Sequence, residues 1–402
     1  MSTDFSEDSS DSPEENTAGN SVASLIGGST ASFLNYMSYE SSQINPSIIT
    51  KKRPVMFFSD VEKFLSEKFK DKLKLVEEII ETNQENIEKV FSDIVENIEK
   101  GGEPINRIYR VIEHALNIRF YQTESLLSLF SLLSKKYGYE NNENNYECRK
   151  SIRLYSMLVQ QGIIPKKEEK EVLSMKEIIE VFPEDSIEKS FINDDVDTFI
   201  KKSPDDSFNA NVSIDSKSPV HYVTEWATSE VSYLHLMAYF GAVKCFKYTI
   251  LTEDFNLEYL EEYAVAGGNM EIIKLLEQKG SSFVNCLTIS IKFHRHEVSD
   301  WILLHYECKE SSFYNSIIDC NYRAFFFATL NGIVLDNYMI DSTSGGDIDI
   351  VKYLTEECHA DTEVKDWNKK TPLHIASEKG YSDIVKYLNE ERHASSSNTS
   401  SE

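Results

Sequence analysis

Two cysteines and three histidines in one stretch of the chain have side chains that could bind a metal. They are Cys286, His294, His296, His305 and Cys308. Zinc binds thiolate sulfur and imidazole nitrogen in proteins, usually in tetrahedral sets with short and regular spacings. The spacings here match no zinc finger, and His294 and His296 share a predicted loop on which we expect histidines to face solvent. The sequence therefore predicts no metal and no other cofactor.

Two further patterns resemble phosphate-binding or catalytic chemistry. The segment Ser-Thr-Ser-Gly-Gly-Asp at 342–347 lacks the Gly-Lys-Ser/Thr ending of a phosphate loop and has no preceding strand. We expect a corner between two helices there. The adjacent acids at 194–195 and 205–206 are of the type that acid–base catalysis uses, but in an acidic protein such pairs are usually helix caps or solvated loops. We therefore expect no enzymatic activity.

Net charge and hydropathy exclude several classes of partner. The 402 residues include 41 basic and 67 acidic side chains, and the net charge of −26 repels nucleic acid and anionic lipid headgroups. The longest apolar run, at 324–330, is far shorter than the ~18 residues that a membrane span needs. No Lys or Arg precedes Lys51, whereas a secretory signal begins with positive charge. We expect an intracellular, cytoplasmic protein with reduced cysteines, no nucleic acid and no membrane insertion.

Residues 1–53 form a Ser-rich acidic tail, with seven acidic and no basic residues in the first fifty. Such a composition buries too little apolar surface to offset the loss of chain entropy, so we predict disorder here and at 395–402. Several serines stand beside acidic residues, as at 6–8 and 12–15. We hypothesise that they are phosphorylated, and a purely solubilising tail is the alternative.

A helical region is predicted from 54 to 184. Apolar side chains recur there at spacings of three and four, which is typical of helices with one buried face. These stripes cover 61–80, 87–98, 108–116, 126–133 and 149–160. Gly101-Gly102 ends the second helix, and Pro104 stands where the next one would begin.

From residue 185 the predicted helices become short and come in pairs. Helices of two turns, such as 186–192 and 196–200, are marginal alone and need neighbours to pack against. One pattern recurs: Gly380-Tyr-Ser-Asp-Ile-Val-Lys-Tyr-Leu has a close copy 34 residues earlier, beginning at Gly346. Weaker copies begin at Gly241 and Gly268, and His294 stands where the next copy should have its glycine. Such repeats predict stacked two-helix units.

The segment Thr371-Pro372-Leu373-His374, followed by Ala376 and Gly380, resembles the ankyrin repeat. The resemblance is strong at 345–394 and degenerate at 185–344. A helical region ahead of degenerate ankyrin units is similar to a large protist family whose helical domain has no known function. The resemblance implies an all-α fold, in which a helical array ends in an ankyrin-like α-solenoid.

The ankyrin motif implies a structural role for each matching residue of the last unit. We expect Thr371 to cap the first helix by accepting from the His374 N–H, and Pro372 to occupy the first helical position. Leu373 should face the core, Ala376 should allow a neighbouring helix to approach, and Gly380 should end the helix in a left-handed conformation.

Two departures from the motif carry further expectations. Lys369 stands where ankyrin loops have a glycine, so we expect a lysine with positive φ. The unit ahead of Gly346 lacks a Thr-Pro-Leu-His start, so we expect its first helix to be truncated or distorted.

Ankyrin proteins bind partners through their loop tips and the exposed side of each first helix. Carried over to this chain, the resemblance implies partner binding by Trp367, Asn368 and Lys370 in the loop and by Glu378 and Lys379 on the helix. Trp367 is the expected anchor, because it offers a large apolar face and one N–H donor, and the alternative is that it packs on the preceding unit.

The function we expect is a non-catalytic scaffold or adaptor that binds a protein partner through its loop tips and concave groove. In the alternative, the array tethers a regulatory or enzymatic module at 54–165. Such a module would show a deep pocket with converging titratable groups.

Overall fold

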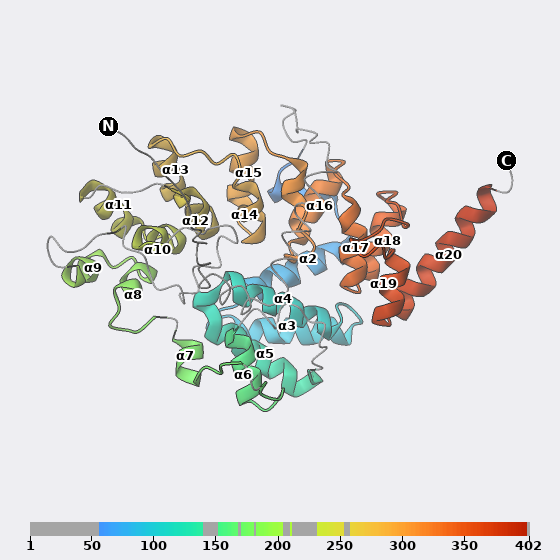
Figure 1. Cartoon of the computed structure of the whole chain (residues 1–402), viewed down its shortest axis with the longest axis horizontal. Helices are drawn as coiled ribbons and strands as arrows, with labels where there is room; N and C mark the ends of the chain where they lie inside the picture. Colours follow the sequence, from blue (N-terminus) through green and yellow to red (C-terminus); the bar gives the residue numbers. More distant parts are fainter. Residues whose placement is uncertain are drawn as a thin grey trace, which may run out of the picture. The chain divides into compact units, whose positions relative to one another are not determined.

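The computed structural model describes residues 56–139, 152–167, 170–180, 182–203, 210, 231–252 and 258–399. The predicted tail at 1–53 and the acid pair at 205–206 lie outside these residues. Every regular element in the described ranges is a helix (Figure 1), which confirms the all-α prediction. None of the described helices is long and apolar enough to cross a membrane.

The N-terminal block, which we define as residues 56–180, contains eight of these elements. They are η1 (Phe58–Phe64), α2 (Glu67–Ile80), α3 (Ile87–Glu99), α4 (Ile105–Ile118), η2 (Phe120–Gln122), α5 (Thr123–Tyr137), α6 (Ile152–Gln160) and α7 (Met175–Ile179). The apolar stripe at 61–80 is not one helix, because extended backbone at Leu65 separates η1 from α2. Gly101 ends α3 with a φ of 76°, as the sequence predicts, and Pro104 is the N-cap of α4 rather than its first residue.

The remaining helices pair into units, each with a first helix, a tight corner and a second helix. The units are α8 (Ile187–Ile192) with α9 (Val196–Lys202), α10 (Tyr233–Phe240) with α11 (Val243–Thr252), α12 (Leu260–Gly267) with α13 (Met270–Gln278), α14 (Leu287–Lys292) with α15 (His296–His305), η6 (Glu310–Phe313) with α16 (Tyr322–Leu330), α17 (Asp336–Ser344) with α18 (Ile348–Glu356), and α19 (Pro372–Lys379) with α20 (Ser382–Thr399).

The units stack side by side. First helix α10 packs against α8 and α12, and α17 packs against α19, while second helix α11 packs against α9 and α13. Each short helix therefore covers the apolar face of its neighbour, which is how a repeat array gains stability that no single unit has.

One residue at each corner has a left-handed backbone. These residues are Asp194, Gly241, Gly268, His294, Cys320, Gly346 and Gly380, with φ between 48° and 82°. Corners from Gly241 to Gly346 follow one another at steps of 26 or 27 residues, and the last step is 34. His294 thus takes the glycine position, as predicted, and Cys320 marks a further unit that lacks the glycine by which the sequence pattern finds the others.

The residue after a corner ties neighbouring units together. Asn269 donates from Nδ2 to the carbonyl of Gly241 at 3.4 Å, and Asn321 donates to the carbonyl of Ile291 at 2.6 Å. Both side chains also accept from backbone N–H groups in the first turn of their own second helix. One amide therefore caps a helix and satisfies a backbone carbonyl of the preceding unit.

The unit ahead of Gly346 does not have the truncated first helix that the sequence predicts. Its first helix, α17, has nine residues, and its buried Tyr338 and Met339 anchor it without a Thr-Pro-Leu-His start. The distorted first helix belongs to the preceding unit, where η6 and a series of turns lead to Cys320. At the other end, α20 continues to Thr399, past the expected boundary at 394.

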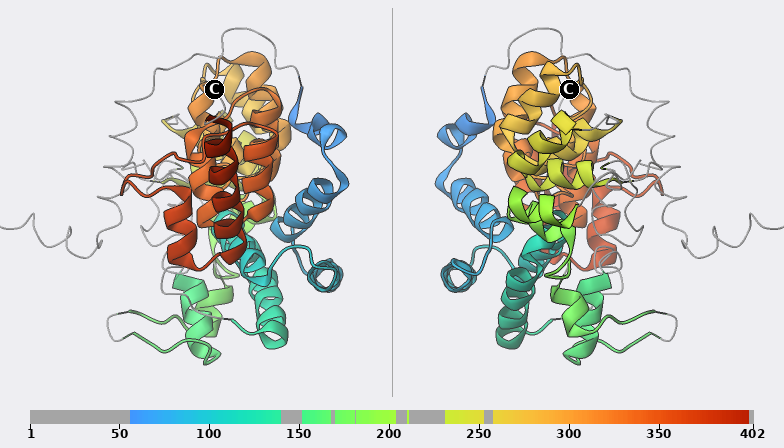
Figure 2. Two further views of the ribbon diagram at one scale, coloured as in Figure 1. Left: turned by 90° about the vertical axis from the view of Figure 1, so that its right-hand side faces the viewer. Right: turned by 90° about the vertical axis from the view of Figure 1, so that its left-hand side faces the viewer.

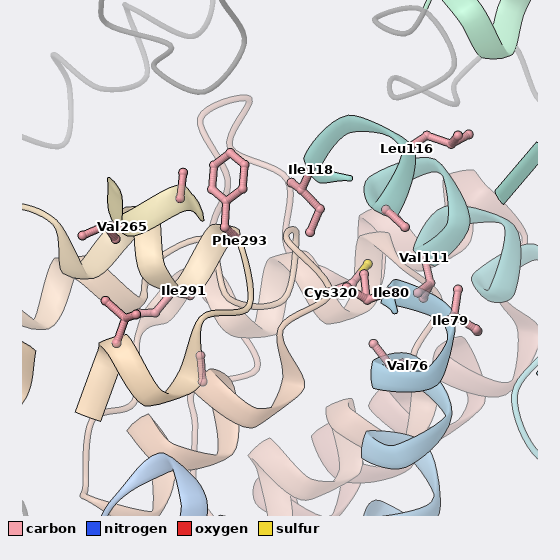
Figure 3. Close-up of a cluster of buried hydrophobic side chains, with 14 of the residues drawn as sticks. Val76, Ile79, Ile80, Val111, Leu116, Ile118, Val265, Ile291, Phe293 and Cys320 are labelled. Carbon is pink, nitrogen blue, oxygen red and sulfur yellow. The ribbon is translucent and has the colours of Figure 1, made fainter. Parts of the chain in front are cut away.

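The N-terminal block shares one apolar core with the array. Figure 3 shows Val76 and Ile80 of α2 and Ile118 of α4 in one cluster with Phe293 and Cys320 of the array. Figure 2 shows the helices of the block beside the stack of units and not between them. The block is therefore packed directly on the array and is not a module tethered to it by a linker.

Candidate protein-interaction surface

The motif at 371–374 begins α19 with a reciprocal cap. Oγ1 of Thr371 lies 2.7 Å from Nδ1 of His374, and the Thr371 N–H donates to the same nitrogen at 3.3 Å. Pro372 stands in the first turn, where its missing N–H leaves no bond unmade. His374 thus does more than supply the N–H that the sequence prediction assigns to it, because its imidazole fixes the Thr371 side chain.

The other motif residues of α19 have the expected structural roles. Ala376 is fully buried, Leu373 is half-buried against the core, and Gly380 ends the helix with a φ of 75°.

A second copy of this cap stands at the start of α10. Oγ of Ser232 lies 2.8 Å from Nδ1 of His235, and the Ser232 N–H donates to that nitrogen at 3.1 Å. Nε2 of His235 lies 3.0 Å from the carbonyl of Glu258, which precedes the next unit. Nδ1 of the histidine therefore accepts within its own unit, and Nε2 donates to the carbonyl of Glu258 and so joins the two units.

The loop ahead of α19 ends in a tight turn at residues 366–370, which we call the finger. The Asp366 N–H donates to the Lys370 carbonyl at 2.9 Å, and the Lys369 N–H donates to the Asp366 carbonyl at 2.9 Å. The Asp366 carboxylate also accepts from the Lys370 N–H at 2.7 Å. Lys369 has a φ of 62°, as the sequence predicts. These bonds fix the finger in one conformation.

The finger presents a large apolar side chain to solvent. Trp367 is 65% exposed, and Asn368 beside it is also exposed. Exposure alternates over residues 364–367. Val364 and Asp366 are half-buried, whereas Lys365 and Trp367 are exposed. The backbone hydrogen bonds of the finger thus hold the indole in solvent at low entropic cost.

The three charged residues expected at the site are engaged within the chain. The ammonium of Lys370 forms an ion pair with Glu378 across the loop and the helix. Lys379 donates to the carbonyl of Ser344 at 2.9 Å and so ties α19 to α17. Burial, together with the nearby Arg110, lowers the pKa of Lys379. These side chains therefore also contribute to packing within the last two units.

A buried cluster of charged side chains, which sequence reasoning missed, joins the block to the array. Nζ of Lys72 lies 2.7 Å from both Glu103 and Asp347, and Arg107 pairs with the same two carboxylates. The Tyr322 hydroxyl donates to Asp347 at 3.2 Å. We call Lys72, Glu103, Arg107 and Asp347 the charge cluster. Each of the four is less than a tenth exposed, and their formal charges cancel.

Converging titratable groups are a signature of active sites, but the charge cluster is internally paired. Burial opposes the charge of Asp347, yet Lys72 and Arg107 hold the pKa of its carboxyl below the usual value. The adjoining cavity, lined by Arg107, Tyr322 and Asp347 among others, has a volume of about 10 Å³, enough for about one water molecule. The geometry is that of a structural joint with no room for a substrate.

The histidines do not face solvent as the sequence predicts. His294 is 9% exposed and lies in a row with His114 and His296, with ring centroids 5.5 Å and 5.9 Å apart. His305 is on the surface of α15, where its Nδ1 donates to the carbonyl of Trp301 at 2.7 Å. The described part of the chain contains no group of three or more His, Cys, Asp or Glu side chains arranged to hold a metal.

Comparison with known families identifies one region of the chain. Residues 335–399 match the family model for ankyrin repeats, which is described as three copies of the repeat. No curated protein matches the sequence. The stacked units and this match together define the C-terminal part of the chain as an ankyrin-repeat region. Ankyrin repeats are generally protein-interaction modules.

Proposed function

We propose that this chain is a protein-interaction scaffold whose partner binds the finger, with Trp367 as the anchor. The observation that carries the proposal is the 65% exposure of Trp367 on a turn closed by three hydrogen bonds. An aromatic side chain with few rotatable bonds on an ordered turn loses little entropy on binding, and such residues dominate the energy of many interfaces.

Asn368, Lys370, Glu378 and Lys379 complete the proposed surface around Trp367. Asn368 offers an exposed amide, and the Lys370–Glu378 ion pair forms part of the polar rim. Surface ion pairs of this kind contribute ~1 kcal/mol or less, so we assign them to orientation and not to affinity. The same exposure argues against the alternative in which Trp367 packs on the preceding unit.

Trp367→Ala tests this proposal in the full-length chain. We expect partners captured from native cells, quantified by mass spectrometry, to fall at least about tenfold, because an anchor residue contributes ~2 kcal/mol or more. Leu251→Ala is the matched control, since Leu251 is 84% exposed on a second helix far along the chain from the finger.

Three results are informative. Selective loss with Trp367→Ala, at an unchanged melting temperature, supports the anchor role. Equal capture by both variants contradicts it. A melting temperature that falls by several degrees in Trp367→Ala favours packing on the preceding unit over partner binding.

A regulatory or enzymatic role of residues 54–165 has weaker support. The titratable groups that converge in the block do so at its contact with the array, where they pair with one another. We propose that the block acts as a lateral brace of the array, which the charge cluster and the shared core fix in place.

A further inference from the structure

Three imidazoles stand in a row where the N-terminal block meets the array: those of His114 and His294 are buried, and that of His296 is half-buried, with 22% of the side chain exposed. His114 lies on α4, His294 is the left-handed corner residue between α14 and α15, and His296 begins α15. We call them the histidine row. Phe58 of η1 stacks on His296 with a centroid distance of 5.9 Å. The histidine row therefore includes a residue of α4 and contacts η1, two of the elements that join the block to this part of the array.

His114 and His294 are each held as neutral donors. Nε2 of His114 lies 3.3 Å from the carbonyl of Lys292, and Nε2 of His294 lies 2.9 Å from the carbonyl of Asp319. Burial holds the pKa of both imidazoles well below 6.5, and His294, Lys292 and Arg119 lower the pKa of His114 further. Each ring thus gives its one proton to a backbone acceptor and faces cations.

His296 has surroundings that oppose a second proton in the same way. Its Nε2 atom is buried, and a hydrogen bond with the Asn321 side chain opposes the lowering of its pKa. Burial, followed by the charge of Arg323, lowers its pKa to about 3. The nearest carboxylate, Glu77 at 3.8 Å, already accepts from Nε of Arg323 at 2.6 Å and from Nη2 at 2.9 Å.

Other charged groups around the histidine row add to this effect. Arg119 is fully buried and donates to the carbonyl of Phe293 at 3.1 Å, and its carboxylate partner, Glu81, is 56% exposed. Arg295 is close enough to Arg119 for burial and mutual repulsion to lower its pKa. Positive charge added to the row would therefore be repelled by Arg119, Arg295 and Arg323.

We propose that the histidine row is an acid-sensitive latch, which holds α4 and η1 on the array while the three imidazoles are neutral and releases them when the imidazoles take up protons. Release frees the rings to solvent, where each can carry its charge. The latch concerns the joint between block and array, so it stands independently of the proposed partner surface.

The direction of the effect follows from linkage. The released state binds protons near pH 6.5, whereas the latched state does not until far lower pH, so the latched state loses population as the pH falls below 6.5. For an open-state pKa of 6.5, lowering the pH from 7 to 5 favours release by about 25-fold per histidine, or about 10⁴-fold for all three. Asp347 of the charge cluster keeps its charge in this window, because its usual pKa is already as low as 3.8 and is lowered further.

Hydrogen exchange of the full chain, followed by mass spectrometry at pH 7 and pH 5 and corrected for intrinsic exchange rates, measures release directly. We expect the opening equilibrium constant of α4 amides to rise by about 10³ to 10⁴-fold, with a much smaller rise in α18. In the variant H114Q/H294N/H296Q, the same opening equilibrium constant should rise less than tenfold, because amide side chains do not titrate. Asn at position 294 tolerates the left-handed corner.

His305→Gln is the matched control, because His305 lies on the same helix as His296 but on the surface, and it should behave as the wild type. If the triple variant does not fold, the single variants test the proposal. In each of them the rise of the α4 opening equilibrium constant between pH 7 and pH 5 should be about 25-fold smaller than in the wild type. A triple variant, or single variants, with the full wild-type response would overturn the proposal. So would equal rises in α4 and α18, which indicate global unfolding.

Discussion

Asp347 shows how much a single buried residue does in this fold. It follows the left-handed Gly346, its side chain accepts from the Ile350 N–H at 3.2 Å to cap α18, and it neutralises Lys72 and Arg107 of the block. Buried ion pairs add little net stability, but a buried charge that loses its partner is costly. The cost of removing the carboxylate should therefore far exceed that of removing an exposed one.

Asp347→Asn should lower the free energy of unfolding by about 3 to 5 kcal/mol, because Glu103 is then the only carboxylate facing two buried cations. Urea titration measures the loss. Asp349→Asn is the matched control two residues later: its partner Lys68 is 65% exposed, so we expect a loss within ~1 kcal/mol. Equal losses in the two variants would show that the charge cluster is not the joint described above.

Lys369 gives a test of backbone strain at the finger. A lysine with a φ of 62° costs ~1 to 2 kcal/mol relative to a relaxed backbone, and glycine removes that cost but loses more chain entropy on folding. Lys369→Gly should therefore raise the free energy of unfolding by about 0.5 to 1 kcal/mol. Lys365→Gly, at an exposed position without positive φ, should lower it instead. Thermal melts of both variants report the sign.

The residue scale is also where prediction from sequence is most uneven. Positive φ at Lys369 and His294 follows from their alignment with repeat glycines, because a repeat fixes backbone geometry whatever residue occupies it. The pairing of Arg107 with Asp347 could not be predicted from the sequence, because the two residues lie 240 positions apart. An apolar stripe shows which face of a helix is buried, but it does not show which other element covers that face. The solvent-facing prediction for His294 and His296 was wrong for the same reason.

At the scale of elements, η1 packs directly against α15 and α16 of the array. The carboxylate of Asp300 on α15 accepts from the Phe58 N–H at 2.7 Å, and Arg323 donates to the Phe58 carbonyl at 3.1 Å. The Phe58 ring stacks on Phe327 with centroids 4.4 Å apart. A short 3₁₀ segment is unstable alone, so these contacts hold it in place.

Phe58→Ala should cost about 3 to 5 kcal/mol of unfolding free energy, because a fully buried aromatic ring leaves a cavity. Cleavage by a nonspecific protease near η1 should become faster at the same time. Phe64→Ala is the control in the same element. Phe64 is 61% exposed, so this substitution should change the free energy of unfolding by no more than ~0.5 kcal/mol. Indistinguishable urea midpoints for the two variants would contradict the anchoring of η1.

Element boundaries could be predicted where glycine marks them and not elsewhere. The corners at Gly241, Gly268, Gly346 and Gly380 follow from the repeat pattern, and the end of α3 follows from Gly101. The corner at Cys320 and the full length of α17 do not, because they depend on burial of side chains that lack a local signature. Tertiary packing determines structure at these places.

At the scale of the whole molecule, the described part of the block and the array share one apolar core, so they should unfold together. Tryptophan fluorescence does not report the block, because residues 56–180 contain no tryptophan and Trp301 and Trp367 lie in the array, whereas the helical circular dichroism signal reports both parts. We expect the two signals to give one urea midpoint. In Asp347→Asn the midpoint should fall and the helical signal should begin to decrease first, since the block is then held less tightly than the array. A wild-type chain that loses helical signal well before fluorescence would mean that the block is independently folded, and the brace role proposed for it would fail.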